Sequence, residues 1–252
     1  MNDITSKSQS STHVDVIIVG AGISGIGAAY HLQQQCPEKS YKILDAQPAI
    51  GGTWTTHIYP GIRSDSDLFT FGYRFKPWTG APIASAAQIL KYLSEVIEEN
   101  DIQPHIHHQH TVLSADWDSA TQQWTLQVRD GATNKVKHCS CNFLWMCQGY
   151  YRHGEGFTPV WPGMETFKGQ IIHPQTWPEN LSCEGKRVVV IGSGATAATL
   201  VPAIADKCAH VTMLQRSPTY VRTAPNANEL ANTLRELEVP LEWTHEIVRR
   251  KS

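Results

Sequence analysis

Two copies of a strand, a glycine turn and a helix are the feature that most constrains how this chain can fold. The first copy, VDVIIVGAGISGIGAAYHLQQQC, opens with a β-branched apolar run over residues 14–19 that is typical of a buried parallel strand. Gly20, Gly22 and Gly25 then give GxGxxG before a helix expected to end near Cys36. These glycines permit a tight turn, close approach to a pyrophosphate and close helix–strand packing. The alternative is a packing turn that holds no ligand.

The residue that ends the next expected strand sets the ligand preference of the first turn. The strand YKILDA ends at Asp45. Its carboxylate can accept hydrogen bonds from both hydroxyls of an adenine ribose, and it would repel a ribose 2′-phosphate. The first turn is therefore predicted to hold FAD or NAD rather than NADP.

The second copy, KRVVVIGSGATAATLVPAIADKC, repeats the pattern with GxGxxA. Its predicted binding residues are Gly192, Ser193, Gly194, Ala195, Thr196 and Ala197. The next expected strand, HVTMLQ, ends at Arg216 and Ser217, where the first copy has an acid. A guanidinium can pair with a 2′-phosphate, although a solvated surface charge is the alternative. The simplest assignment is FAD at the first turn and NADPH at the second.

Two such copies predict an α/β fold with two Rossmann-like dinucleotide-binding domains, both incomplete within 252 residues. We expect a disordered tail over residues 1–13 and the N-terminal part of an FAD-binding domain over residues 14–160. A linker over residues 161–182 would lead to the N-terminal part of an NADPH-binding domain over residues 183–252. The C-terminal residues predict a helix, a break at Pro240 and the start of another helix.

Composition excludes several functional classes. A formal charge of -2 and a pI of about 6.6 argue against a nucleic-acid-binding protein. Residues 1–13 lack the apolar core of a signal peptide. The longest apolar stretch, residues 14–32, contains Asp15 and four glycines, so it does not predict a transmembrane segment. We therefore expect a cytoplasmic protein with reduced thiols.

Cysteine and histidine spacing gives little support for a metal site, and none is predicted. The pair Cys139 and Cys141 lacks further ligands, and the cluster PHIHHQH lacks an acid or a thiol to complete a shell. The cluster is predicted to lie in one polar strand, DIQPHIHHQHTVLSADW, with His108 and His110 on one face. The six cysteines form no CxxC or CxxxxC pair, which disfavours a disulfide reductase.

A third motif lies between the two copies and gives the reaction class. Residues 167–178, FKGQIIHPQTWP, match FxGxxxHxxxWP at Phe167, Gly169, His173, Trp177 and Pro178. This stretch resembles the fingerprint of the Baeyer–Villiger monooxygenases, within the wider class of flavin-containing monooxygenases. Together with GGTWTTHIYPGIRSDSDLFTFGYRFKPW and FLWMCQGYY, it makes the chain similar to the bacterial ethionamide-activating subgroup. The resemblance covers residues 14–221.

The resemblance implies further cofactor-binding residues. They are Ser24 over the FAD pyrophosphate, Gly51, Gly52, Thr53 and Trp54 along the flavin, Arg63, Ser64 and Asp65 where flavin and nicotinamide meet, and Val112 in a strand flanking the adenine. Asp45 stands where the family usually has Glu, and Cys147 stands where the class often has an alanine beside the FAD.

Two of the implied roles are catalytic in the wider sense. Asp65 matches an acid that tunes the reactive arginine and the reduction step. His173 is implied to couple domain movement to the flavin rather than to act as a base, with Phe167 and Trp177 as anchors.

The implied activity is an FAD- and NADPH-dependent monooxygenase. A flavin peroxide would insert one oxygen atom from O2 into a small-molecule ketone, giving an ester or lactone, or would oxidise a sulfide. The family's active-site arginine is expected beyond residue 252. A fragment, a truncated product and one half of a split enzyme with a separately encoded C-terminal half all stay open. An N-hydroxylating flavin monooxygenase and a catalytically silent nucleotide-binding fragment remain the alternative functions.

Overall fold

The computed structural model describes residues 12–221 and 223–251, which fall into two compact units. The first unit contains the residues up to Gly52 together with Leu93–Tyr151. The second contains Thr53–Tyr92 and the residues from Arg152 onward. Residues 1–11, most of the predicted tail, lie outside the described residues. The assignment of an FAD-binding and an NADPH-binding domain stays a prediction at this stage.

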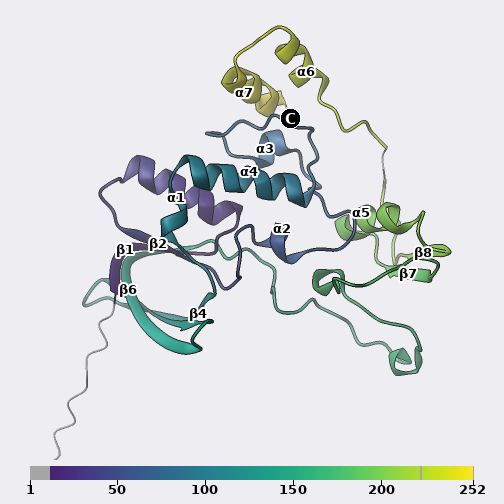
Figure 1. The fold of residues 1–252 in the computed structure, drawn as a ribbon, viewed down its shortest axis with the longest axis horizontal. Coiled ribbons are helices and arrows are strands. Elements are labelled where there is room, and N and C mark those ends of the chain that lie inside the picture. Colours follow the sequence, from purple (N-terminus) through teal and green to yellow (C-terminus); the bar gives the residue numbers. More distant parts are fainter. Residues whose placement is uncertain (1–11, 222, 252) are drawn as a thin grey trace, which may run out of the picture. The chain divides into compact units, whose positions relative to one another are not determined.

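A six-stranded sheet with the order β3-β2-β1-β6-β5-β4 forms the first unit (Figure 1). Strands β3, β2, β1 and β6 run parallel, and β5 and β4 continue the sheet as an antiparallel meander. The strands are β1 (Thr12–Val19), β2 (Tyr41–Leu44), β3 (Ile106–His107), β4 (His110–Asp118), β5 (Gln123–Asp130) and β6 (Lys135–Met146). The parallel strands β1 and β2 are those that the sequence predicted around the first glycine turn.

Burial explains why residues 16–19 of β1 form an unbroken apolar run. Ile17 and Ile18 point to opposite faces of the sheet, and both are almost completely buried. Helix α1 (Ile23–Gln35) buries its small and apolar residues, including Ile26 and Ala29. The predicted helix end near Cys36 is confirmed, because the last helical residue is Gln35.

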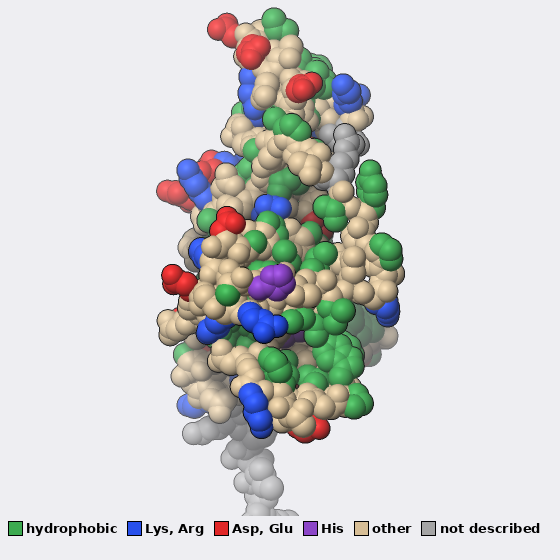
Figure 2. All heavy atoms as spheres, turned by 90° about the vertical axis from the view of Figure 1, so that its right-hand side faces the viewer, with side chains coloured by type: hydrophobic (Ala, Val, Ile, Leu, Met, Phe, Trp, Pro, Cys, Tyr) green, Lys and Arg blue, Asp and Glu red, His purple; other side chains and the backbone are tan. Residues whose placement is uncertain are grey.

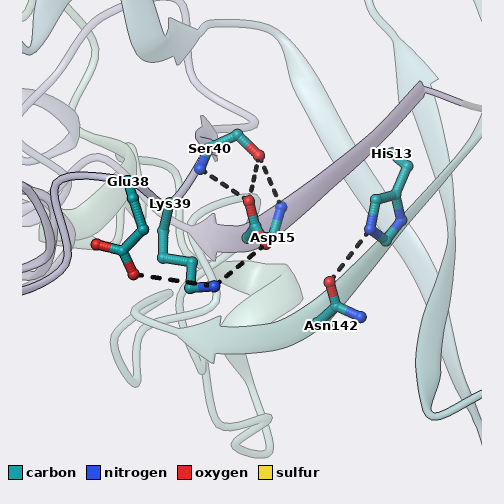
Figure 3. Close-up of polar contacts among 6 residues, drawn as sticks. All are labelled: His13, Asp15, Glu38, Lys39, Ser40 and Asn142. Carbon is teal, nitrogen blue, oxygen red and sulfur yellow. Dashed lines mark hydrogen bonds and ion pairs between the residues drawn. The ribbon is translucent and has the colours of Figure 1, made fainter.

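A polar cluster fixes the end of β1 at which the chain enters the sheet (Figure 3). The Asp15 carboxylate accepts hydrogen bonds from the hydroxyl and the N–H of Ser40, at 2.6 and 2.9 Å. The Ser40 hydroxyl oxygen in turn accepts the Asp15 N–H at 3.0 Å. These bonds lower the pKa of Asp15 and hold the loop between α1 and β2 against β1. The ring of His13, also on β1, lies 3.2 Å from the side-chain oxygen of Asn142 on the neighbouring strand β6.

The predicted single strand through the histidine cluster is wrong. The chain forms the 3₁₀ turn η1 (Gln103–His105), then β3, and then turns at His108 and Gln109 before β4 begins at His110. Gln109 has a φ of 57°, in the left-handed region that is typical of a turn. His108 and His110 therefore do not share a strand face. Within the described part of the chain, no group of three His, Cys, Asp or Glu side chains is placed to hold a metal ion.

The second glycine turn lies in a smaller sheet of the second unit, where β7 (Arg187–Ile191) and β8 (His210–Leu214) run parallel. Helix α5 (Ala195–Ile204) packs on one face of this pair (Figure 1). Its residues Leu200 and Ile204 form a core cluster with Tyr59, against which Val188 and Val190 of β7 pack. The strands and helix predicted for the second copy are confirmed.

The other face of β7 and β8 is apolar and exposed. Val189, Ile191 and Leu214 are 60%, 57% and 55% exposed, and the register pairs Ile191 with Leu214. Parallel sheets normally carry cover on both faces. We call these three side chains the open face of β7 and β8. Large hydrophobic residues are also exposed elsewhere, and Figure 2 shows such side chains gathered in clusters on one side of the molecule.

The remaining helices are a 14-residue helix, several short helices and two helices near the C-terminus. They are α2 (Thr53–Thr56), α3 (Leu68–Phe71), α4 (Ala86–Glu99), η2 (Met164–Thr166), η3 (Pro174–Thr176), α6 (Glu229–Glu236) and α7 (Leu241–Lys251). The predicted break at Pro240 between two C-terminal helices is confirmed. Asn228 caps α6 by accepting the Ala231 N–H at 3.0 Å. Among the described residues, no helix has the length and apolar character needed to cross a membrane.

Helix α7 carries a buried histidine that should make stability depend on pH. His245 is 2% exposed and lies beside Phe69, with ring centroids 6.3 Å apart. Burial chiefly lowers its pKa below 6.5; Arg249 and Arg74 add to this effect, whereas Glu246 and a hydrogen bond to the Phe69 backbone oppose it. On acidification the imidazole of His245 therefore takes up a proton in the unfolded state before it does so in the folded state. Its contribution to the free energy of unfolding should be complete above about pH 6.5 and should be lost as the pH falls toward the folded pKa.

The measurement is urea unfolding at about pH 7.5 and about pH 5.5 on the wild type and His245→Gln. We expect the variant to lose less stability on acidification, because its amide does not titrate. Equal losses in both proteins would contradict the assignment. His57 and His107 also have lowered pKa values through burial, so the variant should keep part of the slope.

Candidate dinucleotide-binding turns

The two glycine turns have nearly the same backbone conformation. Gly20 and Gly192, the first glycines, have φ values of 106° and 113°. Each donates its N–H across the sheet, Gly20 to the carbonyl of Leu44 and Gly192 to that of Leu214, both at 2.8 Å. Only glycine adopts such φ values without strain. The sequence repeat is therefore a repeat in three dimensions, down to the hydrogen bond that ties each turn to the following strand.

Both helices that follow the turns begin at a bare glycine. Gly22 starts α1 with φ −80° and ψ −172°, and Gly194 starts α5 with φ −78° and ψ −170°. Neither helix has a side-chain cap at its N-terminus. A Cβ at Gly22 would meet only the Gly52 Cα, at 3.9 Å, and one at Gly194 would meet nothing within 4 Å. Each turn thus has the open space and the uncapped helix dipole that a pyrophosphate requires.

Close packing of backbone on backbone forces glycine at two positions of the first turn. A Cβ at Gly20 would lie 2.5 Å from the carbonyl oxygen of Cys147, and one at Gly25 would lie 1.8 Å from the carbonyl oxygen of Gly20. Cys147 follows β6 and donates its N–H to Val19 at 2.8 Å. The segment that the resemblance places beside the FAD therefore lies directly against the turn.

The glycine pair before α2 also lies at the first turn. Gly51 donates its N–H to the carbonyl of Ala21 at 2.9 Å, and Gly52 has a φ of 54°. These two residues thus join Gly20, Gly22 and Asp45 in the first unit. Thr53 and Trp54, which continue the same motif, belong to α2 in the second unit. Trp54 packs there against Phe71 at 6.0 Å between ring centroids.

Asp45 has a contact that sequence reasoning missed. The side chain is 7% exposed, and its Oδ2 accepts the N–H of Ala21 inside the glycine turn at 2.5 Å. Its Oδ1 accepts the N–H of Gln47 at 2.7 Å. Asp45 therefore clamps the turn to the end of β2. Each carboxylate oxygen keeps a second lone pair, so the ribose contact stays a prediction.

The other predicted residues of the first unit lie in α1 and β4. Ser24 is exposed in the first turn of α1. Val112 lies in β4 beside an irregularity in its pairing with β5, and it packs against the core cluster that contains Ile17 and Leu44. The structure thus places Val112 in the packing of the sheet, and its contact with an adenine remains a prediction.

The segment Arg63 to Asp65 belongs to the second unit, whereas the first turn belongs to the first unit. Ser64 is buried, and its backbone N–H and its hydroxyl oxygen both bond to Ala84, at 2.8 and 3.1 Å. Arg63 forms an isolated bridge with Ser85. Asp65 is exposed and accepts a hydrogen bond from the Ser66 hydroxyl at 3.2 Å. Ser64 therefore holds the loop, whereas the side chains of Arg63 and Asp65 are on the surface.

The second turn differs from the first in two side chains that sequence reasoning had singled out. Ala197 places a methyl group, 5% exposed, where the first turn has Gly25. Arg216 and Ser217 are exposed and follow β8 after Gln215. The loop they begin returns to the turn, because the Thr219 hydroxyl lies 2.6 Å from that of Ser193. Thr196, the remaining polar residue, lies in the first turn of α5.

His173 starts the short helix η3 in the predicted linker. Its Nδ1 accepts the N–H of Gln175 at 3.2 Å. Gln175 is 9% exposed, and its amide donates to the carbonyls of Glu155, at 3.2 Å, and Arg152. A hollow of about 460 Å³ adjoins His173; its lining residues are Glu155, Gly156, Phe157, Thr158, His173 and Thr176.

The two expected anchors of the linker behave differently. Trp177 packs against the core cluster around Leu200 and Ile204, as an anchor should. Phe167 is 60% exposed, so it does not pack as an anchor among the described residues, and its anchoring role stays a prediction. An aromatic residue in a loop is not necessarily buried, because the sequence motif carries no information on what lies opposite it.

Gly156 should be required for the position of His173. A Cβ at Gly156 would lie 2.0 Å from the His173 Nδ1 and 2.5 Å from its Cγ, so the whole ring would have to move. Gly156→Ala is expected to destabilise the second unit by about 1–3 kcal/mol through overpacking. Gly154→Ala, two residues earlier, meets nothing within 4 Å and should stay within about 0.5 kcal/mol of the wild type. Urea unfolding measures both, and equal stabilities for the two variants would refute the contact.

Comparison with known proteins agrees with this architecture. A model of a flavin-binding monooxygenase-like family matches residues 81–228, and a model of an NAD(P)-binding Rossmann-like domain matches residues 18–82. The FAD-containing monooxygenase EthA of Mycolicibacterium smegmatis is 51% identical over 242 residues, which are 95% of this chain and 49% of that protein. The probable FAD-binding monooxygenase AlmA of Acinetobacter baylyi is 48% identical, over 95% of this chain and 48% of its own length.

Solved structures give the same result. An oxidized steroid monooxygenase bound to NADP matches with a TM-score of 0.75 and 29% identity, over 90% of this chain and 43% of its own. A cyclohexanone-bound cyclohexanone monooxygenase matches with a TM-score of 0.74 and 26% identity, over 91% and 44%. The chain spans about half the length of the relatives it matches. The predicted α/β fold and the predicted resemblance are confirmed, and the chain belongs to the flavin-binding monooxygenase-like family.

Proposed function

We propose that the chain binds FAD at the first glycine turn and NADPH at the second, and that it serves an NADPH-dependent flavin monooxygenase. One observation carries the proposal. Two turns with the same backbone are followed, after the next strand, by residues of opposite charge, Asp45 and Arg216. The relatives named FAD-containing monooxygenases and the NADP-bound neighbour support the two cofactors. On this proposal residues 14–160 are the FAD-binding part, 161–182 the linker and 183–252 the NADPH-binding part.

The bound cofactors would supply hydride transfer and the activation of O2. The chain's own residues bind and orient them. The uncapped N-termini of α1 and α5 would face the two pyrophosphates, and Asp45 holds the Ala21 N–H so that the first turn keeps its shape. Arg216, exposed after β8, would pair with the 2′-phosphate. The tuning role of Asp65 and the coupling role of His173 are parts of the same proposal.

The substrate class is a small ketone or an organic sulfide, together with O2. The motif FxGxxxHxxxWP is complete, and a structural neighbour carries cyclohexanone. These two findings favour oxygen insertion next to a carbonyl over N-hydroxylation, which shares only the glycine turns. We further propose a cytoplasmic location for this activity.

The open face of β7 and β8 supports a further protein partner. Val189, Ile191 and Leu214 form an apolar surface on a parallel pair that is covered on one side only. The relatives are about twice as long as this chain. We propose that this face is covered by a polypeptide that corresponds to the other half of the relatives. The proposal includes the case in which that half is encoded by a separate gene. If that half co-purifies with the wild type but not with Ile191→Asp, the result would support the proposed contact. Equal recovery of that half with the wild type and with Ile191→Asp would reject it.

Spectroscopy and product analysis test the proposed function. The protein, alone and with the remaining half supplied, is loaded with FAD and mixed with NADPH without oxygen. The flavin absorption bands should bleach. Admission of O2 with a ketone or a sulfide should then give the ester, lactone or sulfoxide. Flavin that binds but does not bleach in either preparation would contradict the NADPH site, and bleaching without any oxygenated product would contradict the monooxygenase.

A further inference from the structure

Two cysteines far apart in the sequence meet at the entrance of the second sheet. Cys183 lies in the loop before β7, and Cys208 lies in the loop between α5 and β8. Backbone hydrogen bonds join these two loops on either side of Cys208. The Gly185 N–H donates to the carbonyl of Lys207 at 2.9 Å, and the Ala209 N–H donates to that of Lys186 at 3.0 Å. The loops are therefore held together independently of the thiols.

The two thiols lie near each other within this arrangement. Both cysteines are free and half-buried, and Cys183 is close enough to Cys208 to affect its pKa. Cys208 also packs against the core cluster of Leu200 and Ile204, which limits its movement. Burial chiefly, and the Cys183 thiol in addition, raise the pKa of Cys208. A thiol that stays protonated is a poor first nucleophile, which leaves the first attack to Cys183.

We propose that Cys183 and Cys208 form a reversible disulfide that locks the second dinucleotide-binding unit, with hydrogen peroxide as the oxidant. The Cys183 thiolate attacks the peroxide, the O–O bond breaks, and a sulfenic acid and hydroxide form, which takes up a proton to give water. The Cys208 thiol then loses its proton and attacks the sulfenic sulfur, which releases a second water and forms the S–S bond. Two thiols and one peroxide thus give one disulfide and two waters.

The position of the cross-link determines its effect. The ring it closes contains β7, the glycine turn at Gly192 and α5, so the disulfide constrains these elements in the unfolded state. It lies before β7, whereas Gly192 follows the other end of the strand, so nucleotide access is not blocked. In a reducing compartment such a bond would be transient and redox-sensing.

A second pair in the chain lacks this geometry. Cys139 and Cys141 are two positions apart in the extended strand β6, so their Cα atoms are about 6.5 Å apart along the strand. Their side chains stand parallel on one face, which keeps the Cβ atoms farther apart than a disulfide permits. Cys141 is also fully buried. The two cysteines that are nearest in the sequence are therefore not the pair that can form a disulfide.

Peptide mapping tests the proposal on the complete chain. The protein is treated with hydrogen peroxide, its remaining thiols are alkylated, and the cysteine peptides are identified by mass spectrometry. We expect the loss of two thiols and one linked peptide pair containing Cys183 and Cys208, reversed by dithiothreitol. Cys36→Ser, which leaves both partners in place, should give the same linked pair. Cys183→Ser and Cys208→Ser should give none.

Thermal unfolding gives a second readout that does not depend on the variants folding well. Oxidation should raise the unfolding temperature of the wild type by roughly 5–10 °C, and dithiothreitol should reverse the shift. Sulfinic acid at Cys183 with Cys208 unmodified, a linked pair of other cysteines, or unchanged thiols after peroxide treatment would each overturn the proposal.

Discussion

Gly25→Ala is expected to remove FAD from the purified protein and to destabilise the first unit by about 3 kcal/mol. The reason is a backbone contact that has no freedom to relax. The added Cβ would lie 1.8 Å from the Gly20 carbonyl oxygen and 3.0 Å from its carbon. The helix α1 would have to move away from β1, and the turn between them would open. FAD released from the denatured protein measures the first effect, and urea unfolding measures the second.

Two further glycine variants separate folding from binding. Gly22→Ala has room in the fold, because its nearest neighbour is the Gly52 Cα at 3.9 Å, but it places a methyl group where the pyrophosphate should approach. It should keep the wild-type stability and lose FAD. Gly194→Ala, in the second turn, meets nothing within 4 Å and should keep both stability and FAD. Wild-type FAD content in Gly25→Ala would contradict the account of the first turn.

Arg216→Ala is expected to raise the Kd for NADPH by about 10- to 100-fold, the range of a lost charge-assisted hydrogen bond. NADH lacks the 2′-phosphate, so its Kd should change by no more than about twofold. The FAD content should stay at the wild-type value, because Arg216 belongs to the second turn. Fluorescence or calorimetric titration of the FAD-loaded protein gives both constants.

Arg187→Ala is the matched control for this prediction. Arg187 is also an exposed arginine of the second sheet, but it lies at the start of β7, away from Gly192. Its removal should leave NADPH binding unchanged. Equal loss of NADPH and NADH affinity in Arg216→Ala, or equal effects of the two arginine variants, would show that Arg216 does not select the 2′-phosphate.

The local elements around both glycine turns could be predicted from the sequence because local rules determine them. An apolar β-branched run predicts a buried strand, and glycines at fixed spacing predict the turn and the helix that follows. That is why β1, α1, β7 and α5 lie where the sequence predicts them: β1 and β7 end at the predicted residues, Val19 and Ile191, and α1 ends one residue before Cys36. The charge contrast between Asp45 and Arg216 was also readable, since both residues follow the strand after their turn.

Contacts between distant segments could not be predicted. The clamp from Asp45 to Ala21, the bond from Ser64 to Ala84 and the approach of Gly156 to His173 each depend on how loops meet. Polar composition made the histidine cluster resemble one strand, whereas the positive φ of Gln109 splits it into β3 and β4.

Simultaneous binding of the two cofactors tests the central claim most directly. The protein is equilibrated with FAD and with increasing NADPH, and both bound nucleotides are quantified after separation from free ligand. If each turn holds its own cofactor, the protein will carry FAD and NADPH in equimolar amounts, and excess NADPH will not displace FAD. Displacement of FAD by NADPH, or saturation with only one of the two, would contradict the assignment of two sites distinguished by Asp45 and Arg216.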